Sequence, residues 1–282
     1  MSKAHVKILD NETADDWSKV YNQVMQQSLR FSPLSSSTLL KIAEYLNIHG
    51  VTFLLSYEKL RPSAICSYLV DKVKKELSIL DFGVLPIANT SGAILLDHLL
   101  HLARSSGCNR VKTWLPTTST RSLDTLAEYL FSPGRAKSVM RCFLEEPPEE
   151  FDCEISEIIS NQDDDITLLP FQVPYQMQSL IESLMSPWKY AYRISSRNNQ
   201  NEAIDVYLTN KHRLQAWIFQ SNQSERPVNF EILSSSTAFL YDTGVRDIFT
   251  EVESGELWQL PYKDVGFDRV TTRFELYFEI NY

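Results

Sequence analysis

The order of candidate secondary-structure elements is interrupted once and then begins again, which favours a fold built from two similar parts. The interruption is EEPPEEFDCEISEIISNQDDD at 145–165, where acidic residues and two prolines leave few apolar side chains to bury. Such stretches are typical of domain boundaries. We therefore predict one domain over residues 1–150 and a second over 151–282, with the boundary near Phe151.

The first half carries alternating signals for helix and strand. Polar residues that can cap a helix precede apolar residues at helical spacing over 13–28, and a second helical pattern follows over 36–47. The runs VTFLLSYEKLRPSAICSYLV and ELSILDFGVLP, broken by the turn-like EKLRP, predict three antiparallel strands. The remaining predictions are a strand at 6–9, a helix over 92–106 that ends at Gly107, a strand at RVKTWLP, a helix over 122–131 and a strand near VMRCFLEE.

The second half repeats this order of elements. ITLLPF is predicted as a strand, PYQMQSLIESLM as a helix, and AIDVYL, LQAWIFQ and VNFEIL as three strands. A shift of 152 residues places SYEKLRPSA (56–64) on LTNKHRLQA (208–216), with identical residues at three of nine positions. Three identities could arise by chance, but the matched segments hold the same place in the order of elements, as duplicated units should.

The composition excludes several classes of function. A net charge of -9 gives no electrostatic reason to bind nucleic acid or an anionic membrane. No run approaches the ~18 apolar residues of a membrane helix, and the N-terminus lacks an apolar signal-peptide core, so we expect a cytoplasmic protein. The cysteines lack the CxxC spacing of zinc or redox sites and are expected to be free thiols in the core: Cys66, Cys108, Cys142 and Cys153.

With Val84-Leu85-Pro86 ending the fourth strand and GAILLDHLLHLARSSG at 92–107, the first half resembles the GNAT (N-acetyltransferase) superfamily. The resemblance implies an α/β (α+β) chain of two GNAT-like domains, each a mixed, mostly antiparallel, twisted sheet flanked by helices. The second half resembles the family mainly through YKDVGF at 262–267 and the following RFELYFEI. It is therefore expected to be the more degenerate domain.

The resemblance also implies a cofactor, acetyl-CoA or another acyl-CoA, between the fourth and fifth strands of the first domain. In the family a loop of the form R/Q-x-x-G-x-G/A receives the pyrophosphate at a helix N-terminus, where unpaired N–H groups and the helix dipole favour an anion. Here only Ile-Ala-Asn-Thr-Ser stands between Pro86 and Gly92, and the missing glycines remove part of the physical basis for binding. The cofactor-binding candidates are Gly83, Val84, Asn89, Thr90, Ser91, Gly92 and Ala93, with the alternative that Thr90 and Ser91 only cap a structural helix.

Three residues are candidates for proton transfer. Asp81 is the only ionisable residue in ILDFGV and could deprotonate an amine directly or through water, although it could also be a strand-edge aspartate. The resemblance implies that Tyr262, or Tyr129 near the matching place in the first half, protonates the leaving thiolate of coenzyme A. Either tyrosine could instead be structural. His98 and His101 lie three apart on one helix, but no third ligand is visible and we expect no metal.

The leading hypothesis is an acyl-CoA-dependent N-acyltransferase that transfers an acetyl group to a small-molecule or peptide amine by direct attack. The backbone around Gly83 and Val84 would then stabilise the oxyanion. A second hypothesis is a degenerate pair of GNAT-like domains that binds a partner or ligand without catalysis. A third is an aminoacyl transferase resembling those that build peptidoglycan cross-bridges, which the acidic charge disfavours. The substrate, the active domain and the oligomeric state are left open.

Overall fold

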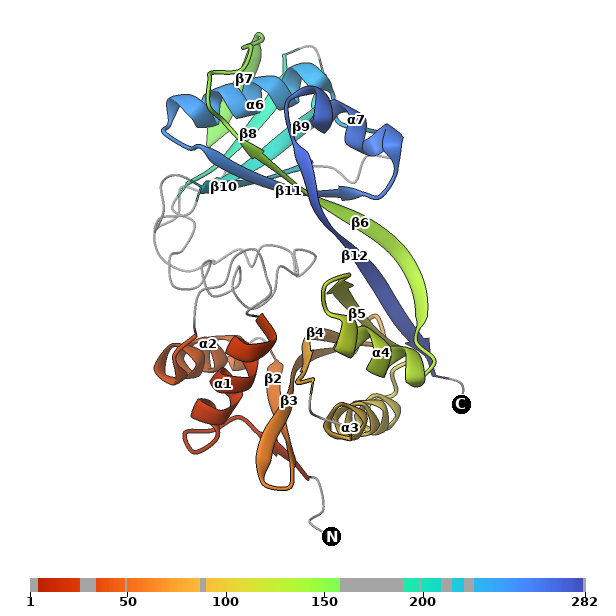
Figure 1. The fold of residues 1–282 in the computed structure, drawn as a ribbon. Coiled ribbons are helices and arrows are strands. Elements are labelled where there is room, and N and C mark those ends of the chain that lie inside the picture. The colour runs from red at the N-terminus through yellow and green to blue at the C-terminus, as the bar shows by residue number, and fades with distance from the viewer. Residues whose placement is uncertain are drawn as a thin grey trace. The chain divides into compact units, whose positions relative to one another are not determined.

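The computed structural model describes residues 5–25, 34–48, 50–86, 90–157, 190–197, 199–208, 215–220 and 226–280. These residues form two compact units (Figure 1). Unit 1 holds the described residues up to Arg135 and those from Arg273 onward, and unit 2 holds those from Ala136 to Thr272. The predicted boundary between the two sequence domains, near Phe151, stays a prediction. The elements predicted at ITLLPF and PYQMQSLIESLM, like Asn89, lie outside the described residues.

Unit 1 is a mixed sheet with helices on both faces. Its helices are α1 (Ala14–Met25), α2 (Ser36–Ile48), α3 (Ser91–Ser105) and α4 (Thr120–Glu128). Its strands are β1 (His5–Ile8), β2 (Val51–Glu58), β3 (Arg61–Asp71), β4 (Glu76–Val84), β5 (Arg110–Pro116) and the part of β12 (Asp268–Glu279) that begins at Arg273. The strands follow the order β1-β2-β3-β4-β5-β12, and the β4–β5 pair is parallel while the other ladders named here are antiparallel.

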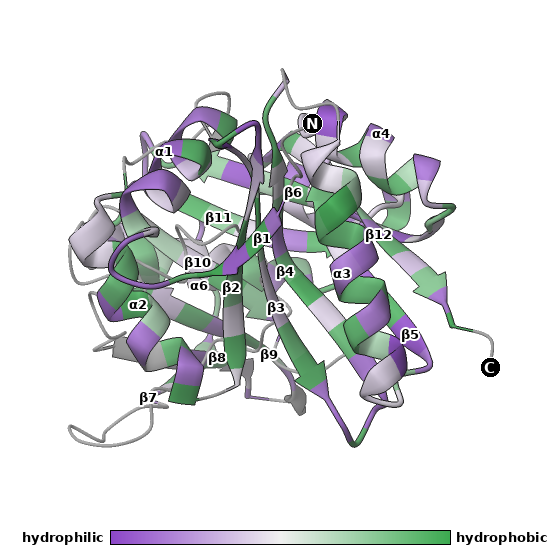
Figure 2. Cartoon of the chain, turned by 90° about the horizontal axis from the view of Figure 1, so that it is seen from below, coloured by the Kyte–Doolittle hydropathy of each residue, from purple (hydrophilic) through white to green (hydrophobic). Residues whose placement is uncertain are grey.

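Two neighbouring residues of β4 show that α1 and α3 cover opposite faces of this sheet. A Cβ atom on Gly83 would meet Val24 of α1, whereas Val84 contacts the position of Gly92 in α3. Successive strand residues point to opposite faces, so the two helices lie on either side of β4. Figure 2 shows polar and apolar residues alternating along α3, and its buried side chains, Leu95, Leu96, Leu99, Leu100 and Ala103, pack on the sheet.

Both helices that follow β4 in unit 1 end in the same way. After α3, the N–H of Cys108 donates to the Ala103 carbonyl at 2.9 Å, and Gly107 has the left-handed φ of 72°. This confirms the predicted ending at Gly107. The prediction that the next helix runs to Phe131 is wrong, because α4 ends at Glu128. There Leu130 takes the left-handed conformation, with φ 61°, and the N–H of Phe131 closes onto the Leu126 carbonyl at 3.1 Å.

Unit 2 has the same plan. Its strands are the part of β6 (Ser132–Phe143) that begins at Ala136, β7 (Cys153–Glu157), β8 (Tyr190–Ser196), β9 (Asn199–Leu208), β10 (Gln215–Gln220) and β11 (Asp247–Glu253), and its helices are α6 (Phe230–Asp242) and α7 (Glu256–Asp264). The order is β7-β8-β9-β10-β11-β6, with β10 and β11 parallel. The fold class of mixed, mostly antiparallel sheets flanked by helices is therefore confirmed. Among the described residues, no helix is long and apolar enough to cross a membrane.

The segment VNFEIL, which precedes the serines of SSSTAF (234–239), is predicted as a strand, and this prediction is wrong. Helix α6 begins within VNFEIL, where the side chain of Asn229 caps it by accepting the N–H of Glu231 at 2.8 Å. The serines lie inside the helix. Ser234 Oγ donates to the Glu149 carbonyl at 2.6 Å, and Ser235 Oγ accepts the N–H of Phe151 at 2.9 Å. These bonds to residues 149–151 hold polar side chains in a buried helix face.

The two units do repeat, but the predicted offset of 152 residues is wrong. Strand β10 is followed by a helix and a parallel neighbour, so it matches β4, whereas the 152-residue shift places it on β3. The structural match sets Gly107 on Gly244, 137 positions apart, and Leu130 on Gly266, 136 positions apart, all with positive φ. Strands β5 and β11 have seven residues each, and α4 and α7 have nine each.

Candidate functional site

Strands β4 and β5 are paired over only part of their length. Parallel pairing joins Glu76–Ile79 to Arg110–Thr113 and goes no further. At the same level the β3–β4 ladder shifts register, since Tyr68 pairs with Ile79 and Ser67 pairs with Asp81. Leu80 is therefore the extra residue of a β-bulge, which bends a strand. We call the unpaired part, residues 80–84 and 114–116, the β4–β5 divergence.

Asp81 lies just after this bulge. Its side chain is half-buried and accepts a hydrogen bond from Ser67 Oγ at 2.7 Å. Strand β4 lies between β3 and β5 in the sheet, but at Asp81 it is paired only with β3, so the strand-edge alternative stays open. Strand alternation places Asp81 on the same face as Gly83, which is the face that α1 covers.

Beyond the bulge, the backbone N–H groups of β4 point alternately toward β3 and toward the β4–β5 divergence. The N–H of Leu85 donates to the Ser63 carbonyl at 2.9 Å, so the antiparallel alternation directs the N–H of Gly83 toward β3 and that of Val84 toward the divergence. On the same side, Ser122 Oγ of α4 donates to the Phe82 carbonyl at 3.1 Å. Of the two predicted backbone donors, Val84 therefore faces the divergence and Gly83 does not.

The N-terminus of α3 follows β4 in the chain. Thr90 is the N-cap residue, and its side chain makes no capping hydrogen bond. Ser91 is fully buried, and its hydroxyl lies 3.5 Å from Glu58 Oε2, which is also 3.4 Å from the Thr90 backbone nitrogen. A carboxylate thus meets the first turn of α3, where an anion is favoured. Thr90 thus holds the N-cap position without a side-chain capping bond, and the alternative that Thr90 and Ser91 only cap a structural helix stays open.

Gly92 is needed for close packing between α3, β4 and α4. A Cβ atom there would come within 2.9 Å of Val84 Cγ2 and 3.0 Å of Thr125 Cγ2. Such contacts are too short for any side chain unless a neighbour moves. Gly92 therefore points into the protein, and Ala93, the next residue, is half-buried.

The two candidate tyrosines both have structural contacts. Tyr129, the C-cap of α4, donates its hydroxyl to the Ala93 carbonyl at 2.9 Å, and burial followed by the Asp97 carboxylate raises its pKa to about 12. Tyr262 is 3% exposed in the core of unit 2, with its ring edge-on to Phe267 at 5.5 Å. Burial raises its pKa to about 12. Their roles as general acids stay predictions.

The residue in unit 1 that matches Tyr262 is Leu126, not Tyr129. The N–H of Phe267 donates to the Tyr262 carbonyl at 2.9 Å, as the N–H of Phe131 does to the Leu126 carbonyl at 3.1 Å. In the sequence, Phe131 and Phe267 could have revealed this match, because aligning these two residues sets the register between the two helix endings. It places Tyr129 three residues from the matching position.

Unit 2 has aromatic residues where unit 1 has polar ones. Pairing between β10 and β11 covers only Gln215–Trp217 and Asp247–Phe249. When the parallel strand pairs of the two units are matched, Ser78 corresponds to Trp217 and Lys112 corresponds to Phe249. The residue after the bulge in β4, Asp81, corresponds to Phe219. Trp217 stacks on Phe219 with ring centroids 5.9 Å apart and lies 5.4 Å from Phe249.

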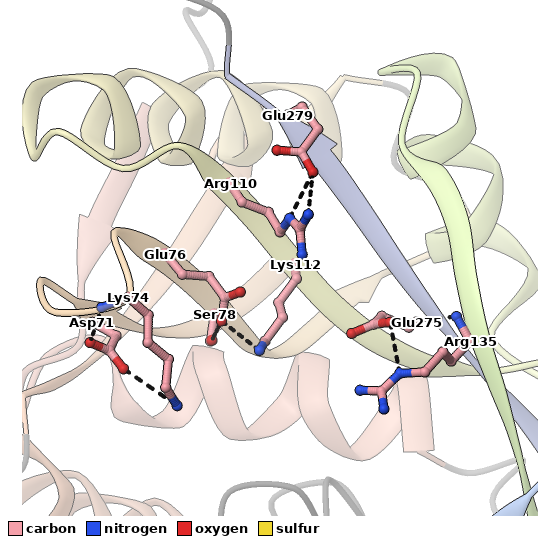
Figure 3. A network of polar contacts seen from close by, with 9 residues as sticks. All are labelled: Asp71, Lys74, Glu76, Ser78, Arg110, Lys112, Arg135, Glu275 and Glu279. Carbon is pink, nitrogen blue, oxygen red and sulfur yellow. Dashed lines mark hydrogen bonds and ion pairs between the residues drawn. The ribbon is translucent and has the colours of Figure 1, made fainter.

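Strands β4, β5 and β12 and the first residues of β6 carry a network of ion pairs in unit 1 (Figure 3). Lys112 pairs with Glu76, Arg110 with Glu279, and Arg135 with Glu275. Of these pairs, only Arg110 and Glu279 are both exposed, and an exposed pair of this kind contributes about 0–1 kcal/mol. Sequence reasoning singled out none of these residues, nor Glu58, Ser67 and Ser122.

Within the described part of the chain, no group of three histidine, cysteine or acidic side chains could hold a metal ion. His98 and His101 are both exposed on α3. The four cysteines are free, and three of them are buried.

The comparisons with known proteins concern the fold. No protein-family model and no curated protein sequence matches the chain. Solved structures do. A GCN5-related N-acetyltransferase from Sphaerobacter thermophilus matches with a TM-score of 0.67 and 14% identity, over 100% of this chain and 97% of that one. A tandem GNAT protein from the clavulanic acid biosynthesis pathway matches with a TM-score of 0.67 and 12% identity, over 98% of both chains.

A third match is a GCN5-related N-acetyltransferase from Anabaena variabilis, with a TM-score of 0.58 and 10% identity, over 99% of this chain and 73% of that one. These likenesses confirm the predicted tandem GNAT fold. Identities this low show a shared fold, and the activity has to be argued from the site.

Proposed function

We propose that the chain is an acyl-CoA-dependent N-acyltransferase, that the acyl group is acetyl, and that the reaction takes place in unit 1. The observation that carries the proposal is the β4–β5 divergence. It brings a half-buried carboxylate, Asp81, and an outward backbone donor, the N–H of Val84, onto one strand that leads to the N-terminus of α3.

Each of these groups suits one step of acyl transfer to an amine. Asp81, held by Ser67, accepts the proton of the attacking amine directly or through water. The N–H of Val84 donates to the acyl oxygen as negative charge develops there. Acyl-CoA, when bound, supplies the activated thioester. The acceptor is a small-molecule or peptide amine that approaches from the α1 face, where Asp81 lies.

Unit 2 has no carboxylate at the position of Asp81, which supports unit 1 as the site of the reaction. Phe219 stands at the position of Asp81 and stacks on Trp217, and Trp217 and Phe249 lie together where β10 and β11 begin to part. An aromatic side chain cannot accept a proton from an amine. Tyr262 is buried in the core of this unit, beside Phe267.

The experiment that tests the proposal is a calorimetric titration with acetyl-CoA of the wild type, Thr90→Asp and Thr90→Asn. Thr90 is exposed at the N-cap of α3, and both replacements are good N-cap residues of similar shape. They differ by one negative charge. We expect Asn to preserve binding and Asp to weaken it about tenfold or more through repulsion of the pyrophosphate.

Equal binding by the two variants would remove the α3 N-terminus from the cofactor site. No binding by the wild type at millimolar acetyl-CoA would end the acetyltransferase proposal. Gly92 is a poor place for such a test, since any side chain there collides with Val84 and Thr125.

The second candidate function is a GNAT-fold protein that binds a ligand or partner without catalysis. The observation that favours it is Leu126, a fully buried leucine at the position that Tyr262 holds in unit 2. Whether or not such a protein binds acetyl-CoA, it would release no free coenzyme A in the presence of amines. A thiol-release assay with a panel of primary amines therefore separates the two functions.

A further inference from the structure

Glu58 brings a carboxylate from one end of the sheet to the N-terminus of α3. It is the last residue of β2 and pairs with Arg61 across a two-residue turn. That turn, Lys59 and Leu60, has φ values of 51° and 66°, as a tight hairpin requires. The chain therefore fixes where the Glu58 backbone lies, and the side chain reaches from there to α3.

The contacts of Glu58 with α3 use the groups that would receive an anionic ligand. Glu58 Oε2 lies 3.4 Å from the Thr90 nitrogen and 3.5 Å from the Ser91 hydroxyl. The first N–H groups of a helix have no partner within the helix, and the helix dipole adds a partial positive charge. Thr90 leaves this end without a side-chain cap. The carboxylate therefore lies at the partly positive end of the helix, where a phosphate group would bind.

We propose that Glu58 is a built-in competitor for the anionic part of the cofactor at the N-terminus of α3. The inference rests on the proposed function, because it concerns the same site. Glu58 is only half-buried and its contacts with Thr90 and Ser91 are long, so its carboxylate can leave α3 when a diphosphate arrives. Binding then displaces one anion by another, and the unit holds its cofactor loosely.

The test is a titration of the full chain with two probes, inorganic pyrophosphate and coenzyme A, at low ionic strength. Glu58→Gln keeps the shape of the side chain and removes its charge. We expect it to bind both probes roughly tenfold more tightly than the wild type, given the usual size of charge effects at partly exposed helix ends. Glu44→Gln, on the exposed face of α2, changes the net charge equally and should change neither affinity more than about twofold.

A second variant tests the inference if Glu58→Gln misfolds. Glu58→Asp keeps the charge but shortens the side chain, which withdraws the carboxylate from Thr90 and Ser91. It should also bind pyrophosphate more tightly than the wild type, and circular dichroism verifies that each variant is folded.

The outcomes separate the inference from the proposed function. Wild type and Glu58→Gln binding coenzyme A equally well would overturn the inference and leave the proposed function in place. Pyrophosphate bound more tightly by Glu58→Gln, with no coenzyme A bound by either protein, would uphold the competitor and reject the proposed function. Binding of neither probe to either protein would overturn both.

Discussion

Leu126 of α4 and Tyr262 of α7 occupy the same position in two copies of one helix ending. Each offers its carbonyl to a phenylalanine N–H five residues on, at 3.1 Å to Phe131 and 2.9 Å to Phe267. Both side chains are buried, at 0% and 3% exposure. The two units thus share a backbone and differ in chemistry at a position where the GNAT resemblance implies a proton donor. The divergence of the copies is local, and single substitutions can test it.

The residue that ends each helix gives the first prediction. Leu130 and Gly266 both adopt positive φ, but only glycine does so without steric cost. We expect Leu130→Gly to stabilise the protein by about 0.5–1 kcal/mol, since relief of roughly 1–2 kcal/mol of strain exceeds the added entropy of the unfolded chain. Gly266→Ala should destabilise it by about 1 kcal/mol, because its Cβ has room and only the backbone is strained.

Urea unfolding followed by circular dichroism measures both changes. Leu130 is 79% exposed, so its removal costs little burial. A loss of stability in Leu130→Gly would mean that the leucine side chain makes a contact that outweighs the strain.

The sequence predicted the elements of unit 1 well because their signals are local. Apolar periodicity and Gly107 were enough for α3, and aliphatic runs were enough for β2, β3 and β4. The end of α4 was missed because Leu130, a residue that rarely takes positive φ, stands where glycine is usual.

Unit 2 was harder because its local signals conflict with its packing. VNFEIL is rich in β-branched and aromatic residues, and the serines that follow are poor helix formers. Bonds from Ser234 and Ser235 to residues 149–151 offset that preference, and nothing in the sequence reveals them. The offset of the repeat was wrong for a related reason, since β-hairpins resemble one another and a nine-residue match cannot tell them apart.

The candidate site was predictable in part. Asp81 was found as the only ionisable residue in ILDFGV, but Ser67 pairs with it through strand register, which the sequence does not show. Glu58 belongs to a turn 32 residues before Thr90, and only the folded sheet brings the two together.

Close packing at Gly92 gives the second prediction. Gly92→Ala should lower the stability by about 1–3 kcal/mol, because the new methyl group meets Val84 and Thr125 at 2.9 and 3.0 Å. The matched control is Gly255→Ala in unit 2, where the nearest atom, on Trp258, is 3.5 Å away and the backbone is extended. It should cost about 0.5–1 kcal/mol, because Gly255 is the N-cap of α7 and alanine is a poorer N-cap residue than glycine. Equal losses in the two variants would show that α3 can shift to make room.

The third prediction concerns Asp81. If it is the general base, Asp81→Asn should lower kcat for an amine found in the thiol-release screen by about 10²–10⁴, with the affinity for acetyl-CoA unchanged. Ser67→Ala removes the hydroxyl that orients the carboxylate and should reduce kcat by a smaller factor. Steady-state rates and calorimetry on the same preparations measure both. Full activity in Asp81→Asn would transfer the role of base elsewhere.

The fourth prediction uses the raised pKa of Tyr262. Burial holds this pKa at about 12, above the value of 10.0 for an exposed phenol. Between these two values the unfolded chain loses the proton and the folded chain keeps it. The stability contributed by Tyr262 is therefore complete below pH 10 and is lost as the pH rises toward 12.

We expect Tyr262→Phe to weaken this alkaline loss, because phenylalanine has no proton to lose. Urea midpoints at pH 8.5 and 11 for the wild type and the variant give the difference. Tyr129→Phe is the necessary comparison, since the pKa of Tyr129 is also raised to about 12. If acyl transfer takes place in unit 1, Tyr262→Phe leaves the rate at neutral pH unchanged, and a large loss of rate would instead locate the general acid in unit 2.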